Sequence, residues 1–376
     1  MSLDLEEIAN LLCVICLVVG LRLTHRLDVL GFWVLLLRVV LVFLTNDVLF
    51  PVSYMPDQVR YIRCAIMYRG GPTEWCTRFG SYAVTVRSAS QIFAAFPMPF
   101  LVSVRSIALI NMVIVIGVYV FLSSRGFFTP ESRLFYLCYP SFMLYSAVGV
   151  RDILILFFMF VALYLLFERG SVWLGLLFAY PLMMVKPQNW FMVMVPFAMY
   201  LLAGKSRARM LGAVVLGFVF VFAILLFGGY LDELNRYRNN FFIEDGGVGS
   251  VELLTPTIML PVQLISAALG VLLMPFPWQV NGAFQLVQSF ENLIVAGLLL
   301  KYWRRQPKPG MENKFLNFKL FFFSSMMIYG AVIFNFGTAA RYRFPFILLF
   351  VIFACRMTIA PASPHPARKK GWLSWF

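Results

Sequence analysis

The chain has 376 residues, of which 61% are hydrophobic and only 13% charged, and its formal net charge is +14. A soluble domain carries about a quarter charged residues and seldom contains apolar runs of about twenty residues, so this composition excludes a soluble globular protein. It predicts an integral membrane protein. The acidic start, MSLDLEE, is unlike a cleavable signal peptide, and the first apolar segment is therefore expected to remain as a span.

Apolar segments follow one another along the chain and predict an all-α, polytopic membrane protein. A window of about nineteen residues gives spans at 8–24, 30–46, 99–122, 133–149, 153–168, 171–186, 189–203, 210–230, 318–336 and 344–360. The stretch 257–300 is apolar but is interrupted by MPFPWQVNG. It fits either one crossing with a re-entrant or interfacial helix, or a pair of crossings.

Basic clusters predict the orientation, because an excess of Lys and Arg marks cytoplasmic loops. The strongest clusters are Lys205/Arg207/Arg209, KYWRRQPK from Lys301, and the C-terminal segment 361–376. With all three inside, the N-terminus is outside and 257–300 crosses an odd number of times. We therefore expect a single transmembrane domain, 1–376, with about eleven spans and a basic cytoplasmic tail.

Two long polar loops, 47–98 and 231–256, are then external. Within the first, "FPVSYMPDQVRYIRCAIMYRGG" is typical of a short amphipathic helix lying at the membrane interface. Cys64 and Cys76 lie in the same loop and can pair as a disulfide if it is extracytoplasmic. The chain has two histidines, each beside basic residues, which excludes a Ser-His-Asp triad and argues against a His-ligated zinc site. We expect no metal site and no cofactor, with a divalent cation left open.

Four basic residues lie at span ends on the expected external side, where positive charge is normally depleted: Arg151, Lys186, Arg341 and Arg343. Taken singly, each is explained by a side chain that reaches lipid phosphates. Together they predict an anion site at the outer interface, because they converge from separate spans. Gln188 lies in the same turn as Lys186 and is a further candidate ligand. Pro187 and Gly337 leave irregular backbone there, which is tolerated where it lines a wet cavity.

A carboxylate in the first external loop is the candidate general base. Asp57 follows Pro56 at a helix start, where Asp is also common as a cap. Arg60 and Arg63, one and nearly two turns further on, are its candidate counter-charges and substrate ligands. Asp152 competes for the role of base, although its neighbour Arg151 makes a structural pair equally reasonable. Charges inside spans, at Arg38, Arg105 and Glu291, are functional candidates unless they pair between spans.

Three stretches resemble polytopic envelope-glycan enzymes. They are "YPSFMLYSAVGVRDILILFFMFVALYLL", "MMVKPQNWF" and "NFGTAARYRFPF". The last is similar to the Asn-x-Gly-Thr…Arg-x-Arg motif of oligosaccharide repeat-unit (O-antigen or capsule, Wzy-type) polymerases, which share an outline with GT-C glycosyltransferases. The resemblance covers about 47–350. The chain departs from the GT-C plan in opening its long loop after the second span and in lacking a DxD motif.

The resemblance implies a GT-C-like fold and glycosyl transfer from a polyprenyl phosphate or pyrophosphate donor at the outer face of a bacterial inner membrane. Arg341 and Arg343 would bind the phosphate with help from Arg151 and Lys186, and Asp57 would activate the acceptor hydroxyl. Repeat-unit polymerisation is preferred, and a GT-C monosaccharide transferase or a flippase of lipid-linked glycan are alternatives. Implied partners are the lipid-linked glycan, membrane lipids and other glycan-assembly proteins, with no nucleic acid.

Overall fold

The computed structural model describes residues 4–46, 48–51, 55–70, 76, 82–203, 206, 208–209, 212, 229–244, 253–257, 259–333 and 335–358. All elements in these ranges are helical. The first half contains α1 (Leu5–Leu23), α2 (Val29–Thr45), α3 (Asp57–Gly70), α5 (Tyr82–Ala95), α6 (Val104–Ser124), α7 (Pro130–Cys138), α8 (Pro140–Ala147) and α9 (Asp152–Phe167). The second half contains α10 (Val172–Val185), α11 (Pro187–Ala203), α13 (Tyr230–Glu244), α14 (Leu260–Leu273), the short 3₁₀ turn η2 (Pro277–Gln279), α15 (Ala283–Arg304), α16 (Glu312–Gly330) and α17 (Phe336–Thr358).

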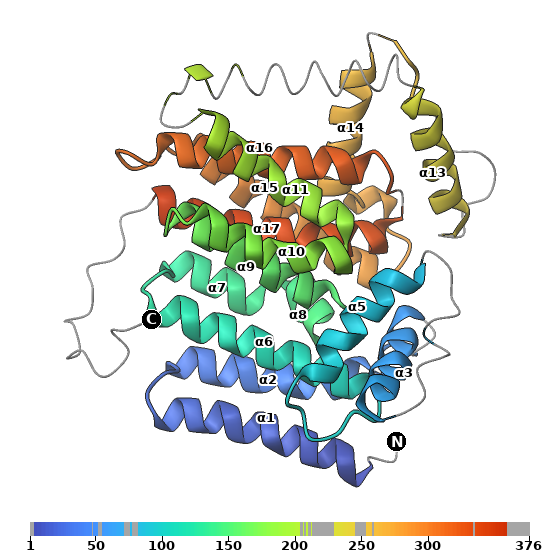
Figure 1. Cartoon of the computed structure of the whole chain (residues 1–376), viewed down its shortest axis with the longest axis vertical. Coiled ribbons are helices and arrows are strands. Elements are labelled where there is room, and N and C mark those ends of the chain that lie inside the picture. The colour runs from blue at the N-terminus through green and yellow to red at the C-terminus, as the bar shows by residue number, and fades with distance from the viewer. Residues whose placement is uncertain are drawn as a thin grey trace.

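The long helices pack side by side with their axes in a common direction, and α17 lies in the middle of the bundle (Figure 1). Its side chains are almost all buried from Phe344 to Cys355. Helices satisfy all of their backbone hydrogen bonds internally, which an apolar surrounding demands. Proline at the first helical position starts α7, α8, and α11, and glycines with positive φ end α6 at Gly126 and α9 at Gly170.

Three described helices are long and apolar enough to cross a membrane: α6, α15 and α17. A fourth is added if α8 and α9, which meet at 118°, form one broken span. The structure therefore has the helical architecture of a membrane protein, while the larger number of spans predicted from the sequence is not established. Much of the predicted span 210–230 lies outside the described residues, as does the tail 361–376.

Two predicted spans have a different form in the structure. The segment 133–149 is divided into α7 and α8, because Pro140 cannot continue the hydrogen bonding of the preceding helix. In 257–300, α15 is long enough to span, whereas α14 has 14 residues, which gives a length of about 21 Å against about 30 Å for a bilayer core. Figure 1 shows α14 steeply inclined to α15 and α16.

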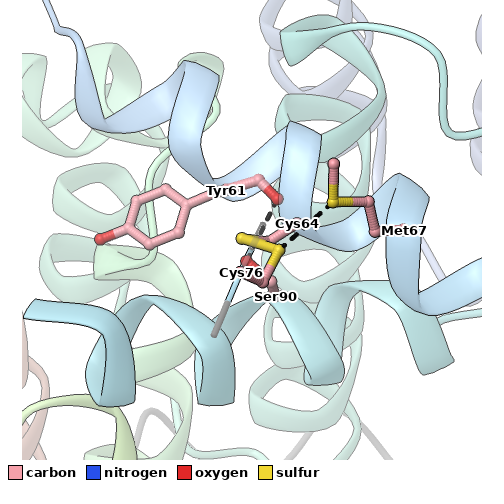
Figure 2. The surroundings of a disulfide bond; sticks show 5 residues. All are labelled: Tyr61, Cys64, Met67, Cys76 and Ser90. Carbon is pink, nitrogen blue, oxygen red and sulfur yellow. Dashed lines mark hydrogen bonds between the residues drawn. A yellow bond between two sulfur atoms is a disulfide. The ribbon is translucent and has the colours of Figure 1, made fainter. Parts of the chain in front are cut away.

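The first long loop folds at one end of the bundle as a helical pair, α3 and α5 (Figure 1). A disulfide joins Cys64 of α3 to Cys76, with a Cα–Cα distance of 5.7 Å, and the Ser90 hydroxyl of α5 donates to the carbonyl of Tyr61 (Figure 2). Arg69 donates to the carbonyls of Ala94 and Met98 at the other end of the pair. These contacts hold α3 and α5 together as one unit.

Charges buried within the bundle are satisfied by neighbouring helices. Arg38 of α2 donates to the carbonyls of Tyr136 and Phe142 and to the Ser146 hydroxyl, where α7 and α8 are interrupted. The Arg105 guanidinium lies 2.7 Å from the Glu7 carboxylate. Arg38 and Arg105 both have partners on neighbouring helices. This pairing explains why the two charges lie inside the bundle, and no functional role is needed to explain them.

Candidate functional site: a basic cluster with two carboxylates

The site is built on an irregular turn between α8 and α9. Asn111 of α6 donates to the carbonyls of Val148 and Val150 at 3.0 and 2.8 Å, and the Gln58 amide oxygen of α3 accepts from the backbone N–H of Gly149. A Cβ at Gly149 would lie 2.7 Å from a backbone oxygen of α6, so only glycine fits this close approach. The turn delivers Asp152 to the first position of α9.

Arg341 of α17 connects two carboxylates that come from distant parts of the chain. Its Nε donates to Asp152 Oδ2 at 2.7 Å, and its Nη1 lies 3.6 Å from Asp57 Oδ2. The Asp152 side chain is only 3% exposed, whereas that of Asp57 is 35% exposed. Asp152 is therefore placed to hold the guanidinium, and Asp57 is the carboxylate that an incoming molecule can reach.

Lys186, in the break between α10 and α11, faces this group from another side. The residue is 5% exposed, and its Nζ lies 3.2 Å from the centre of the Tyr342 ring and 5.4 Å from that of Tyr329. Within the described residues its ammonium has these aromatic partners but no hydrogen bond or ion pair. The N–H donors of this ammonium are suited to bind an anion. The aromatic faces already offset part of the free-energy cost of burying its charge.

The remaining predicted ligands lie around this centre. Arg151 donates to the carbonyl of Val185 at 2.9 Å and lies over the Tyr61 ring. Arg60 is 3.7 Å from Asp57, with about half of its side chain exposed. Arg63 and Gln188 are both exposed at the protein surface. The structure thus brings together six of the predicted residues, namely Asp57, Arg60, Arg151, Asp152, Lys186 and Arg341.

Arg343 does not join them, which corrects the prediction that it lies beside Arg341 as a second phosphate ligand. Its guanidinium is buried and donates to the carbonyls of Val271, Leu272 and Met274 at the end of α14, and to the Asn292 side chain. The reason is that α17 already begins at Phe336. Residues two apart in a helix are separated by about 200°, so Arg341 and Arg343 point to nearly opposite sides.

Four residues of the site were not predicted: Tyr61, Asn189, Tyr329 and Tyr342. Tyr342 stacks on Tyr329, whose hydroxyl donates to the Asn189 side chain. Tyr342 lies in "NFGTAARYRFPF", the motif that contains Arg341, and Asn189 lies in "MMVKPQNWF", the motif that contains Lys186. Their place in these motifs is the sequence signal from which the two residues could have been found. Burial raises the pKa of Tyr61 well above its ordinary value, so this phenol remains neutral beside the Arg151 guanidinium.

The electrostatic balance of the cluster is positive. Two carboxylates, Asp57 and Asp152, are accompanied by three close basic groups, Arg151, Lys186 and Arg341, and by the more exposed Arg60. Such an excess of cationic groups beside aromatic rings can bind an oxyanion. The partly exposed Asp57 carboxylate then places a hydrogen-bond acceptor next to the bound anion. Over the described ranges, no three His, Cys, Asp or Glu side chains are close enough to hold a metal ion.

No protein-family model matches the chain, and comparison with curated proteins and with solved structures found no match. The resemblance to envelope-glycan enzymes therefore rests on the sequence motifs named above. Two of the residues in these motifs, Asp152 and Arg341, are in contact in the structure, and a third, Lys186, faces the same cluster.

Proposed function

We propose that the protein is a membrane glycosyltransferase that uses a polyprenyl phosphate-linked or pyrophosphate-linked donor, and that the cluster around Arg341 is its active site. The observation that carries the proposal is the convergence of Asp57, Asp152, Lys186 and Arg341 from four separate segments at one end of the bundle. A phosphate leaving group needs cationic donors, and an acceptor hydroxyl needs a carboxylate within reach.

In this mechanism the donor phosphate binds between Arg341, Lys186 and Arg151. These groups stabilise the negative charge that builds on the phosphate as the bond to the sugar breaks. Asp57 accepts the proton of the attacking hydroxyl, since it is the more exposed of the two carboxylates. Asp152 is a positioning residue that orients the Arg341 guanidinium. Arg343 binds no substrate and fixes the end of α14 instead.

Repeat-unit polymerisation remains the preferred reaction, on the motif resemblance of "NFGTAARYRFPF". Its test is the glycan of a strain that lacks the gene. A single repeat unit left on the lipid or core supports a polymerase, and a residue missing within every unit supports a single-sugar transferase. Unchanged glycan in such a strain contradicts both.

The active-site assignment is tested with purified protein and a lipid-linked donor. We expect Asp57→Asn to lower transfer by about a hundredfold or more, because general-base catalysis typically contributes about 10²–10⁴-fold. Lys186→Met should raise the concentration of donor needed for half-maximal rate. The matched control is Arg63→Gln, an exposed residue of the same helix as Asp57 that should retain activity. Full activity in both site variants would remove the enzyme proposal.

The proposed membrane arrangement has about eleven spans, the N-terminus outside and the site at the external face. It is tested by labelling single cysteines from each side of the membrane, in a chain whose four unpaired cysteines are replaced. Gln188→Cys, next to the cluster, should react with an impermeant maleimide added from outside. Thr24→Cys, at the other end of α1 and α2, should not react. The opposite result would place the site in the cytoplasm.

A further inference from the structure

A second recess in the molecule is separate from the basic cluster. It has a volume of about 760 Å³ and lies between α13, α14, the end of α16 and the start of α17. On α17 it is lined by Phe336 and Ala339, which lie on the side of the helix that carries Arg343 and not Arg341. A volume of this size falls within the range of sites that hold organic ligands, about 300–1,000 Å³.

The recess is lined by both polar and apolar residues. Thr255, Gln263 and Arg238 are polar lining residues, and Arg238 also donates to the carbonyl of Ala331. Gly270 and Val271, about 11 Å beyond Gln263 along α14, are apolar lining residues. Among the lining residues that the structure describes, Arg238 carries a positive charge and none carries a carboxylate.

Apolar side chains surround the opening. Leu253, Met259 and Val262 line the recess and are each more than half exposed. Exposed apolar side chains beside a recess are suited to contact a hydrocarbon chain in place of water. This arrangement fits an amphiphile with an anionic head group and a hydrocarbon chain.

We propose that the recess binds an anionic phospholipid of the surrounding membrane, with its phosphate beside Arg238 and an acyl chain along Gly270 and Val271. A guanidinium is a good partner for a phosphate, and basic pockets between membrane helices bind anionic head groups. A lipid-linked sugar substrate is disfavoured, because the first turns of α17 separate the recess from Asp57 and Arg341. The proposal is thus independent of the reaction assigned to the basic cluster.

The test is lipid retention by the full chain, reconstituted in nanodiscs of phosphatidylglycerol and phosphatidylcholine, extracted in mild detergent and examined by native mass spectrometry. The wild type should retain phosphatidylglycerol in preference to phosphatidylcholine. Gly270→Phe should lower this retention about tenfold, since a Cβ there meets only Met274 Sδ at 3.7 Å and the ring enters the recess. Gly297→Phe is the matched control, because Gly297 faces open space on α15 and should retain the lipid.

The charge requirement is tested separately at Arg238. Arg238→Gln should abolish the preference for phosphatidylglycerol, whereas Arg238→Lys should keep it. Equal retention by Gly270→Phe and the wild type, no preference in the wild type, or a sugar-bearing lipid in the recess would each overturn the proposal. If Gly270→Phe does not yield folded protein, a photoactivatable phosphatidylglycerol decides: crosslinks on α14 support the site, and their absence from α14 refutes it.

Discussion

Replacing Asp152 by asparagine is the sharpest test of the electrostatics at the cluster. The substitution keeps the shape of the side chain but removes the buried negative charge that lies 2.7 Å from Arg341 Nε. Three basic groups, Arg341, Arg151 and Lys186, would then share only Asp57, which is partly exposed. Removing one member of a buried ion pair costs about 3–5 kcal/mol. Because the asparagine oxygen still accepts a hydrogen bond from Nε, we expect a loss near the lower end, about 3 kcal/mol.

The assay is unfolding of purified protein by SDS titration, which gives the free energy of unfolding of each variant. Lys186→Met removes one of the three uncompensated cations, so adding it to Asp152→Asn should recover about 1–2 kcal/mol. Glu233→Gln is the control, since it removes an equally charged group from an ion pair whose side chains are 70% exposed, and it should change stability by less than about 0.5 kcal/mol. A loss below about 1 kcal/mol for Asp152→Asn, or a double variant less stable than the single one, would refute the reasoning.

Three further predictions concern other parts of the molecule. Arg343→Met should lower the unfolding free energy by about 3 kcal/mol, because carbonyls at the end of α14 lose their donor; transfer per folded molecule should be unchanged, and a selective loss of transfer would restore Arg343 to the active site. Alkylation of the denatured chain should add four maleimides without reductant and six after reduction, since Cys64 and Cys76 are paired and four cysteines are free; six without reductant would exclude the disulfide. Hydrogen bonding to Lys301, with a second bond to a tyrosine, lowers the pKa of Glu131 below its ordinary value. Its stabilisation should therefore be fully present above about pH 4.3 and be lost as the pH falls through the lower folded-state value. Glu131→Gln should cost up to about 1 kcal/mol at pH 7 and progressively less as the pH is lowered below about 4.3, and a penalty that does not shrink toward acid pH would contradict this.

The motif residues show how far local sequence patterns reach. Asp152, Lys186 and Arg341 were recognisable because each is a charged residue at the end of an apolar segment, and such ends gather at the same level of a helical bundle. Asp57 was recognisable as the carboxylate that follows Pro56 at the start of an amphipathic helix. Their mutual contacts were also favoured by chemistry, since oppositely charged groups at one level attract each other. The amphipathic helix that begins at Asp57 was predictable for the same local reason.

Arg343 marks the limit of that reasoning. The stretch "NFGTAARYR" predicts irregular backbone at Gly337 and places both arginines at one anion site. In the structure Asn335 accepts a hydrogen bond from the backbone N–H of Gly337, and the helix begins at Phe336. Asparagine is a common residue at helix starts, so this boundary was available in the sequence as a weak signal. Once the helix begins there, its period sends the two side chains to opposite faces.

The sequence by itself determined that this chain is a helical membrane protein, because apolar runs and their charged boundaries are properties of consecutive residues. It also determined which charged residues stand at those boundaries. Only the tertiary structure decided which of them face one another, which buried charges serve as partners for interrupted helices, and where the bundle leaves a recess. These depend on the rotation and crossing of helices that are distant along the chain, and no local pattern specifies them.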